Sequence, residues 1–125
     1  KAIAVGLKDL NWHVREECLM LLQTYIYDCA SQLEFIEIEK VLLNVFPLLD
    51  DSKPKFNFNN EPVGLKFSPQ VKSTAIDTLV VALKSWTKDR QLHNLINNTV
   101  ESSVLQIVQR KIDGTYFNSL EYLGT

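Results

Sequence analysis

The chain has 125 residues, of which 46% are hydrophobic and 22% charged, and its formal net charge is −2. A chain of this length and apolar content makes one globular domain, and its slight acidity excludes binding of nucleic acid over the whole surface. The longest apolar runs, such as VLLNVFPLL at 41–49, are much shorter than a membrane-spanning helix, and no segment resembles a signal peptide. We therefore expect no membrane association and a cytoplasmic location.

Two amphipathic helices are predicted in the first 49 residues. Over 14–29, apolar residues recur at steps of three and four, which is the spacing of one helix face. Asn11 precedes this stretch and is a suitable N-cap. The same spacing recurs over 36–49, where Pro47 is expected to bend the last turn of a second helix.

A long connection and three more helices follow. Residues 50–69 contain three prolines, a glycine and three asparagines, so an irregular loop is predicted there. Ser68 and Pro69 then supply a cap and a first helical residue for a helix that reaches about residue 86. Shorter helices are predicted at 91–100 and 101–112. No segment alternates with period two, so the fold class is all-α.

Neither catalysis nor metal binding is indicated. Cys18 and Cys29 lie on one predicted helix, about 16 Å apart at 1.5 Å per residue, and cannot form a disulfide with each other. The chain has two histidines and no CxxC motif, so no set of metal ligands is predicted and both thiols are expected to pack as small hydrophobic groups. There is no glycine-rich phosphate loop and no nucleophile motif, so we expect a protein that is not an enzyme and has no cofactor.

An internal repeat points to the architecture. Shifting the sequence by 57 residues places Val14 on Val71, Leu22 on Leu79 and Ile26 on Leu83, so that apolar positions coincide. Helical-hairpin repeats usually have a period near 40, and the loop at 50–69 accounts for the excess. The sequence therefore predicts an α-solenoid of three hairpins in one segment, 1–125. The hairpins span about 1–29, 35–86 with the loop inserted, and 90–112.

Two short motifs resemble the HEAT repeat: FPLLDD at 46–51, and DLNWHVR at 9–15. Within that class, NWHVREECLMLL, FPLLDDSKPK, VLQIVQRKI and FNSLEYL are similar to the TOG domains of the crescerin family, the TOG-array regulators of axonemal microtubules, with CLASP TOG domains as relatives. The resemblance implies the C-terminal half of a TOG domain, with further HEAT repeats before Lys1. It also implies tubulin or microtubules as partner, and a place in the cytoskeleton, including the cilium or axoneme.

The turns between paired helices are expected to form one binding edge. Stacked hairpins bring these turns together, and the resemblance places the tubulin-binding face there. The candidate residues are Trp12, His13, Arg15, Lys53, Lys55, Lys66, Gln70 and Lys72. An aromatic side chain beside basic ones is typical of a protein-binding surface.

Each candidate also has a structural interpretation. Trp12 is equally suited to cover the neighbouring turn, packed on Phe56 or Phe58. Arg15 and Lys72 are placed to pair with the acidic residues Asp9, Asp50 or Asp51, and the loop lysines to be solvated charges.

The alternative function is a generic HEAT scaffold that binds a different protein along its helices. Surface-facing Tyr25, Tyr27 or Trp86 would favour that alternative. A third possibility is a segment that only spaces or caps a longer array.

Overall fold

The computed structural model describes residues 2–49, 55–56, 58–59, 62–63, 68–86 and 90–124. These ranges contain six α-helices and two 3-10 helices, which confirms the all-α class. The helices are α1 (Ala2–Gly6), α2 (Trp12–Cys29), η1 (Ala30–Gln32), α3 (Phe35–Leu43), η2 (Phe46–Leu49), α4 (Pro69–Ser85), α5 (Gln91–Thr99) and α6 (Ser102–Gly124).

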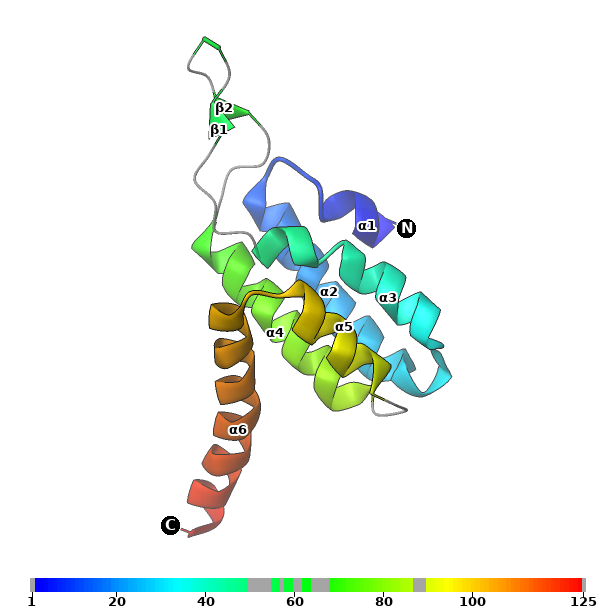
Figure 1. Ribbon diagram of the computed structural model, residues 1–125, viewed down its shortest axis with the longest axis vertical. Helices are drawn as coiled ribbons and strands as arrows, with labels where there is room; N and C mark the ends of the chain where they lie inside the picture. Colours follow the sequence, from blue (N-terminus) through cyan, green and yellow to red (C-terminus); the bar gives the residue numbers. More distant parts are fainter. Residues whose placement is uncertain are drawn as a thin grey trace.

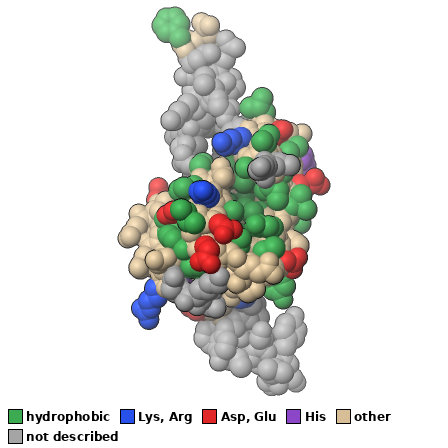
Figure 2. Space-filling model, turned by 90° about the vertical axis from the view of Figure 1, so that its right-hand side faces the viewer, with side chains coloured by type: hydrophobic (Ala, Val, Ile, Leu, Met, Phe, Trp, Pro, Cys, Tyr) green, Lys and Arg blue, Asp and Glu red, His purple; other side chains and the backbone are tan. Residues whose placement is uncertain are grey.

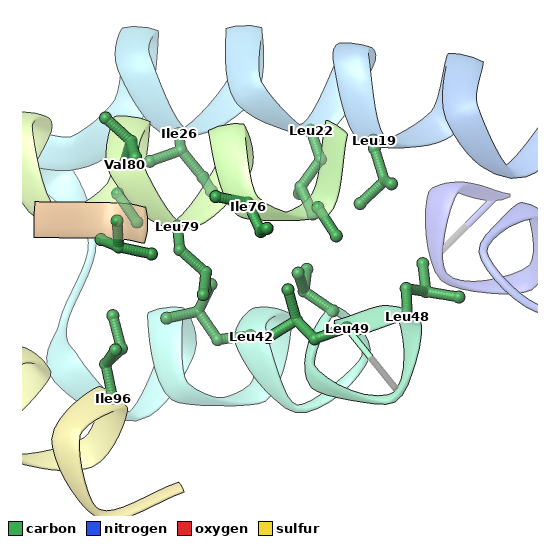
Figure 3. Packing of buried hydrophobic residues seen from close by; sticks show 14 of the residues in the cluster. Leu19, Leu22, Ile26, Leu42, Leu48, Leu49, Ile76, Leu79, Val80 and Ile96 are labelled. Carbon is green, nitrogen blue, oxygen red and sulfur yellow. The ribbon is translucent and has the colours of Figure 1, made fainter. Parts of the chain in front are cut away.

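The helices are arranged in two layers with the core between them (Figure 1). α2 and α4 lie side by side in one layer, and α3, η2 and α5 lie across the core from them (Figure 3). Figure 3 shows the side chains that meet there, among them Leu19, Leu22, Ile26, Leu42, Leu48, Leu49, Ile76, Leu79 and Ile96. Each fully buried leucine or isoleucine contributes roughly 1.5–3 kcal/mol, so this core is the main source of stability.

α2 and α4 run in the same direction, and two hydrogen bonds define their register. Gln23 Nε2 donates to Thr78 Oγ1 over 3.1 Å, across 55 positions in the sequence. Trp86 Nε1 donates to the carbonyl of Leu33 over 3.2 Å, across 53 positions. The first bond lies within the two helices and the second joins the segments just after their ends, and the separation is nearly the same in both, so the helices are parallel. Both separations are close to the 57-residue shift of the sequence repeat.

Trp86 is part of the core. Its side chain is 1% exposed, and its ring lies 5.9 Å from that of Phe35 at an angle of 42°. With the hydrogen bond to Leu33, it joins the end of α4 to the turn between α2 and α3. Trp86 is therefore not a surface residue, contrary to one of the alternatives considered for it.

The second predicted helix is interrupted rather than bent. α3 ends at Leu43, and the chain continues as η2 from Phe46. The amide of Asn44 donates to the carbonyl of Val41 over 3.1 Å, and the tighter 3-10 pattern has already begun. Pro47 has no N–H to donate and its ring would overlap the carbonyl four residues earlier, so a continuous helix through this position is unfavourable.

Two further elements differ from the sequence prediction. β1 (Lys55–Phe56) and β2 (Pro62–Val63) pair antiparallel inside the predicted irregular loop, with Lys55 opposite Val63. Strands of two residues are too short to show a period-two pattern, so no sequence signal was available. α6 continues to Gly124, beyond the stretch 101–112 predicted as helical, because a single glycine, Gly114, weakens a helix without ending it.

The contact between α1 and α2 provides a stability test. A β-carbon added at Gly6 would overlap Cys18 Sγ, whereas one added at Gly114 would meet nothing within 4 Å. We expect Gly6→Ala to lower the free energy of unfolding by about 1–3 kcal/mol. Gly114→Ala is expected to leave it unchanged or to raise it by up to about 1 kcal/mol, because alanine favours helix more than glycine does.

Urea unfolding of the two single variants, of Cys18→Ala and of Gly6→Ala/Cys18→Ala measures these effects. Removing the sulfur should restore most of the stability that Gly6→Ala loses. Equal losses from Gly6→Ala in the presence and absence of the sulfur would contradict the predicted overlap.

Candidate protein-binding edge

The starts of α2 and α4 lie at one edge of the molecule, as parallel neighbours require (Figure 1). We call residues 8–13 and 68–72 the turn edge. The β1–β2 hairpin extends from the same end (Figure 1). The parallel packing of α2 and α4 therefore brings together two turns that are far apart in the sequence.

Two consecutive hydrogen bonds from backbone amides to side-chain oxygens fix the turn before α2. Asp9 Oδ1 accepts from the amide of Asn11 over 2.8 Å, and Asn11 Oδ1 accepts from the amide of His13 over 2.9 Å. Asn11 has an extended backbone, with φ −83° and ψ 119°, and its side chain satisfies one of the free amides at the helix start. The predicted N-cap is confirmed, and it sets the direction in which Trp12 and His13 leave the turn.

Trp12 is half-buried, so it is neither a fully exposed binding residue nor a residue fully enclosed by the neighbouring turn. Part of its ring packs against the hydrophobic core, and the ring stacks on that of His13 with centroids 3.5 Å apart and an interplanar angle of 29°. His13 is exposed, so the stacked pair forms an aromatic surface at the turn edge. Phe58, one of the expected packing partners, is fully exposed at 104%, and the side chain of Phe56 lies outside the described residues.

Arg15 does not belong to the surface, and this corrects its place among the candidate binding residues. Its side chain is 2% exposed, and Nη1 donates to the carbonyls of Asp9 over 2.8 Å and Leu10 over 3.1 Å. Burial lowers the pKa of the guanidinium, and attraction to Asp9 opposes that shift. The guanidinium holds the turn before α2 against the helix, so its role here is structural.

The start of α4, unlike that of α2, has no side-chain cap on its helix amides. Ser68 occupies the N-cap position but is buried, and its hydroxyl donates to Gln70 Oε1 over 3.0 Å instead of accepting from a helix amide. The amide of Lys72 donates to the carbonyl of Ser68 over 3.1 Å. Gln70 is exposed and Lys72 is half-buried, so both reach the turn edge.

The structure describes little of the loop lysines. Lys53 and Lys66 lie outside the described residues, as do the proposed acidic partners Asp50 and Asp51, and for Lys55 only the backbone in β1 is described. Two further residues of the turn before α2, which the sequence did not identify as candidates, are exposed: Lys8, and Leu10 at 76%. Their position in a turn beside Trp12 was the signal that would have identified them.

The described residues of the turn edge carry aromatic, apolar and charged side chains. Within the described ranges, no three His, Cys, Asp or Glu side chains are grouped so that they could hold a metal ion. Cys18 and Cys29 are free thiols, both half-buried. The helices in the described part of the chain include none with the length and apolar character needed to span a bilayer. What the turn edge offers is an aromatic pair, an exposed leucine and a mixed set of charges.

Comparison with known proteins gives no relative: no family model, no curated protein and no solved structure matches the chain.

The role of Arg15 can be measured. Arg15→Met keeps most of the apolar stem but leaves two carbonyls without their donor, so the free energy of unfolding should fall by about 2–3 kcal/mol. Arg110→Met, on an exposed position of α6, is the matched control and should change it by less than about 0.5 kcal/mol. Equal, small effects of the two substitutions in chemical denaturation would show that the buried guanidinium does not stabilise the turn.

Proposed function

We propose that this chain is a TOG-type HEAT-repeat segment that binds tubulin or microtubules through the turn edge, without catalysis. One observation carries the proposal: α2 and α4 are parallel neighbours, and the Trp12–His13 pair lies at the edge where both begin. With tubulin as partner, the proposed location is the cytoskeleton, including the axoneme.

The solenoid is supported by the first two helix pairs. α1 packs on α2, and η2, which follows α3, packs on α4. The second helices of these two proposed hairpins, α2 and α4, are joined in parallel through Gln23 and Thr78. The proposed third pair follows the same order, since α5 packs on α3 and α6 on α4, but α6 is tilted away from the direction of α4 (Figure 1). The proposed row of hairpins is therefore regular over α1–α4 and changes direction at its last helix.

The binding mechanism combines steering with local contact. Tubulin carries a strongly acidic surface, so lysines at the turn edge would increase the rate of encounter. Lys8 and Lys72 supply that charge among the described residues, and the loop lysines Lys53, Lys55 and Lys66 are proposed to add to it. The exposed face of the Trp12–His13 pair and Leu10 would then lose contact with water at the interface, which is where aromatic residues contribute most to affinity.

A generic scaffold for a different protein is the second candidate. The observation that favours it is a pair of exposed hydrophobic residues on the outer side of α2, where Leu21 is 59% and Tyr25 41% exposed. Tyr27 is 74% exposed but lies on another side of the helix. Such residues on a helix face suit a helical partner rather than a partner at the turns.

Charge reversal tests the proposed tubulin-binding edge. We expect Lys8→Glu/Lys72→Glu to weaken co-sedimentation with microtubules roughly tenfold, since each rim charge contributes up to about 1 kcal/mol. The control is Lys84→Glu/Arg110→Glu, which makes the same change in net charge at exposed positions outside the turn edge. Its binding should be close to that of the unmodified chain, and binding of the unmodified chain should weaken as salt is raised.

Contact by the apolar groups is tested separately with Leu10→Ala/His13→Ala. These side chains are exposed, so the substitutions should weaken co-sedimentation while leaving the thermal unfolding midpoint in place. Trp12 is less suitable for this test because part of its ring packs on the core. Unaltered binding of both double variants, or equal losses in the control, would exclude the turn edge as the tubulin-binding surface.

A further inference from the structure

A second surface, unrelated to the turn edge, lies on the outer side of α2. Glu17, Leu21, Tyr25 and Asp28 follow one another at steps of four, four and three residues, which puts them on one face of the helix. All four are exposed, and we call them the outer stripe. Its centre is apolar, and a carboxylate lies one turn beyond the centre at each end.

The apolar centre of the outer stripe continues into a hollow. The hollow has a volume of about 260 Å³ and lies between α1, α2 and α3. Its walls are mainly apolar and include Ile3, Leu7, Leu22, Tyr25 and Val41, with Asn44 as a polar group. Figure 2 shows a broad hydrophobic area, bordered by acidic side chains, on the side of the molecule where α1 begins.

The internal repeat indicates what kind of element fits there. The shift of 57 residues places Leu21 on Thr78 and Tyr25 on Ala82. Both Thr78 and Ala82 are 0% exposed in α4, and Thr78 accepts a hydrogen bond from Gln23 of α2. The two positions that are buried in α4 are thus solvent-exposed at the equivalent places in α2. A helix lying on the outer stripe as α2 lies on α4 would run parallel to α2.

Pairing with a second copy of the chain is disfavoured by charge and polarity. Stacking end to end would place the apolar centre of the outer stripe on α6. The exposed residues of α6 include Gln106, Gln109 and Arg110, and burying such polar groups against apolar side chains is unfavourable. Symmetric pairing of two outer stripes would oppose like charges in either orientation. Glu17 of one copy would face Asp28 of the other if the two α2 helices were antiparallel, and Glu17 of the other if they were parallel. Like charges in direct opposition are destabilising.

We propose that the outer stripe binds a helix of a partner protein, parallel to α2, with apolar or small side chains at its centre and a lysine or arginine facing Glu17. The binding mode is that of an amphipathic helix in an apolar groove, with carboxylates that select a basic partner. This proposal does not depend on binding of tubulin.

The repeat also supplies a probe. In the proposal, the partner helix lies on α2 in the same way that α2 lies on α4. A synthetic copy of α2, residues 12–29 with Cys18→Ser and Cys29→Ser, therefore has the shape needed to take the place of the partner helix. Gln23 of α2 donates to the carbonyl of Thr74 over 3.3 Å and to Thr78 Oγ1 over 3.1 Å, and the shift of 57 relates these two residues to Glu17 and Leu21. A lysine in place of Gln23 in the peptide therefore faces Glu17 of the intact protein.

Fluorescence anisotropy with the intact protein and the labelled peptides gives the test. The peptide with Gln23→Lys should bind at least fivefold more tightly than the peptide with glutamine, and Glu17→Gln in the protein should abolish that difference. Leu21→Asp in the protein should weaken both peptides at least tenfold. The matched control is Tyr27→Asp, an exposed position that points roughly 200° away from Tyr25 around α2 and should leave binding unchanged.

Three results would overturn the proposal. The first is the absence of saturable binding by either peptide, with circular dichroism showing comparable helicity for both. The second is an equal loss of binding in Leu21→Asp and Tyr27→Asp. The third is concentration-dependent dimerisation in sedimentation velocity that Leu21→Asp abolishes, since it would assign the outer stripe to a second copy. Co-sedimentation of Leu21→Asp with microtubules should be unchanged, so failure of this proposal is distinguishable from failure of the tubulin-binding edge.

Discussion

The parallel packing of α2 against α4 is the constraint on which the rest of this structure depends. Apolar side chains from both helices fill the space toward α3 and η2, and Gln23 reaches across to the buried hydroxyl of Thr78. That hydroxyl also donates to the carbonyl of Thr74 over 2.8 Å, so the polar groups inside the interface have partners. A shift of one helix along the other would break these bonds and misplace the leucines together. The register determines which turns share an edge and which face of α2 is left open.

Much of the fold follows from periodicity in the sequence, because the helices bury stripes with a spacing of three and four residues. The all-α class was predicted on that basis, the cap at Asn11 from its residue type, and the correspondence between α2 and α4 from the 57-residue repeat. The break before Pro47 was predicted as a bend, since the sequence does not show how the 3-10 turns of η2 would place Leu48 and Leu49 in the core. The β1–β2 hairpin was missed because its strands have two residues each.

The candidate binding residues were harder to predict than the helices. Position in a turn suggested a surface role for Trp12 and His13, whose rings stack at the start of α2, and equally for Arg15, which is buried. Arginine is long enough to turn back from a helix start to carbonyls five and six residues earlier, and sequence spacing does not distinguish that conformation from an outward one. Conversely, Leu21 and Tyr25 fit a helical core stripe, and only the arrangement of helices shows that no described element covers them.

The two tryptophans occupy environments that differ in their access to water. Trp86 is enclosed at the end of α4 and bonded to the carbonyl of Leu33, whereas Trp12 is half-open at the start of α2 with an imidazole stacked on it. An indole shielded from solvent emits at shorter wavelength and is protected from aqueous quenchers, while a half-open one is accessible to them. The chain therefore carries two intrinsic fluorophores with separate meanings: one reports the integrity of the interior, and the other reports events at the edge.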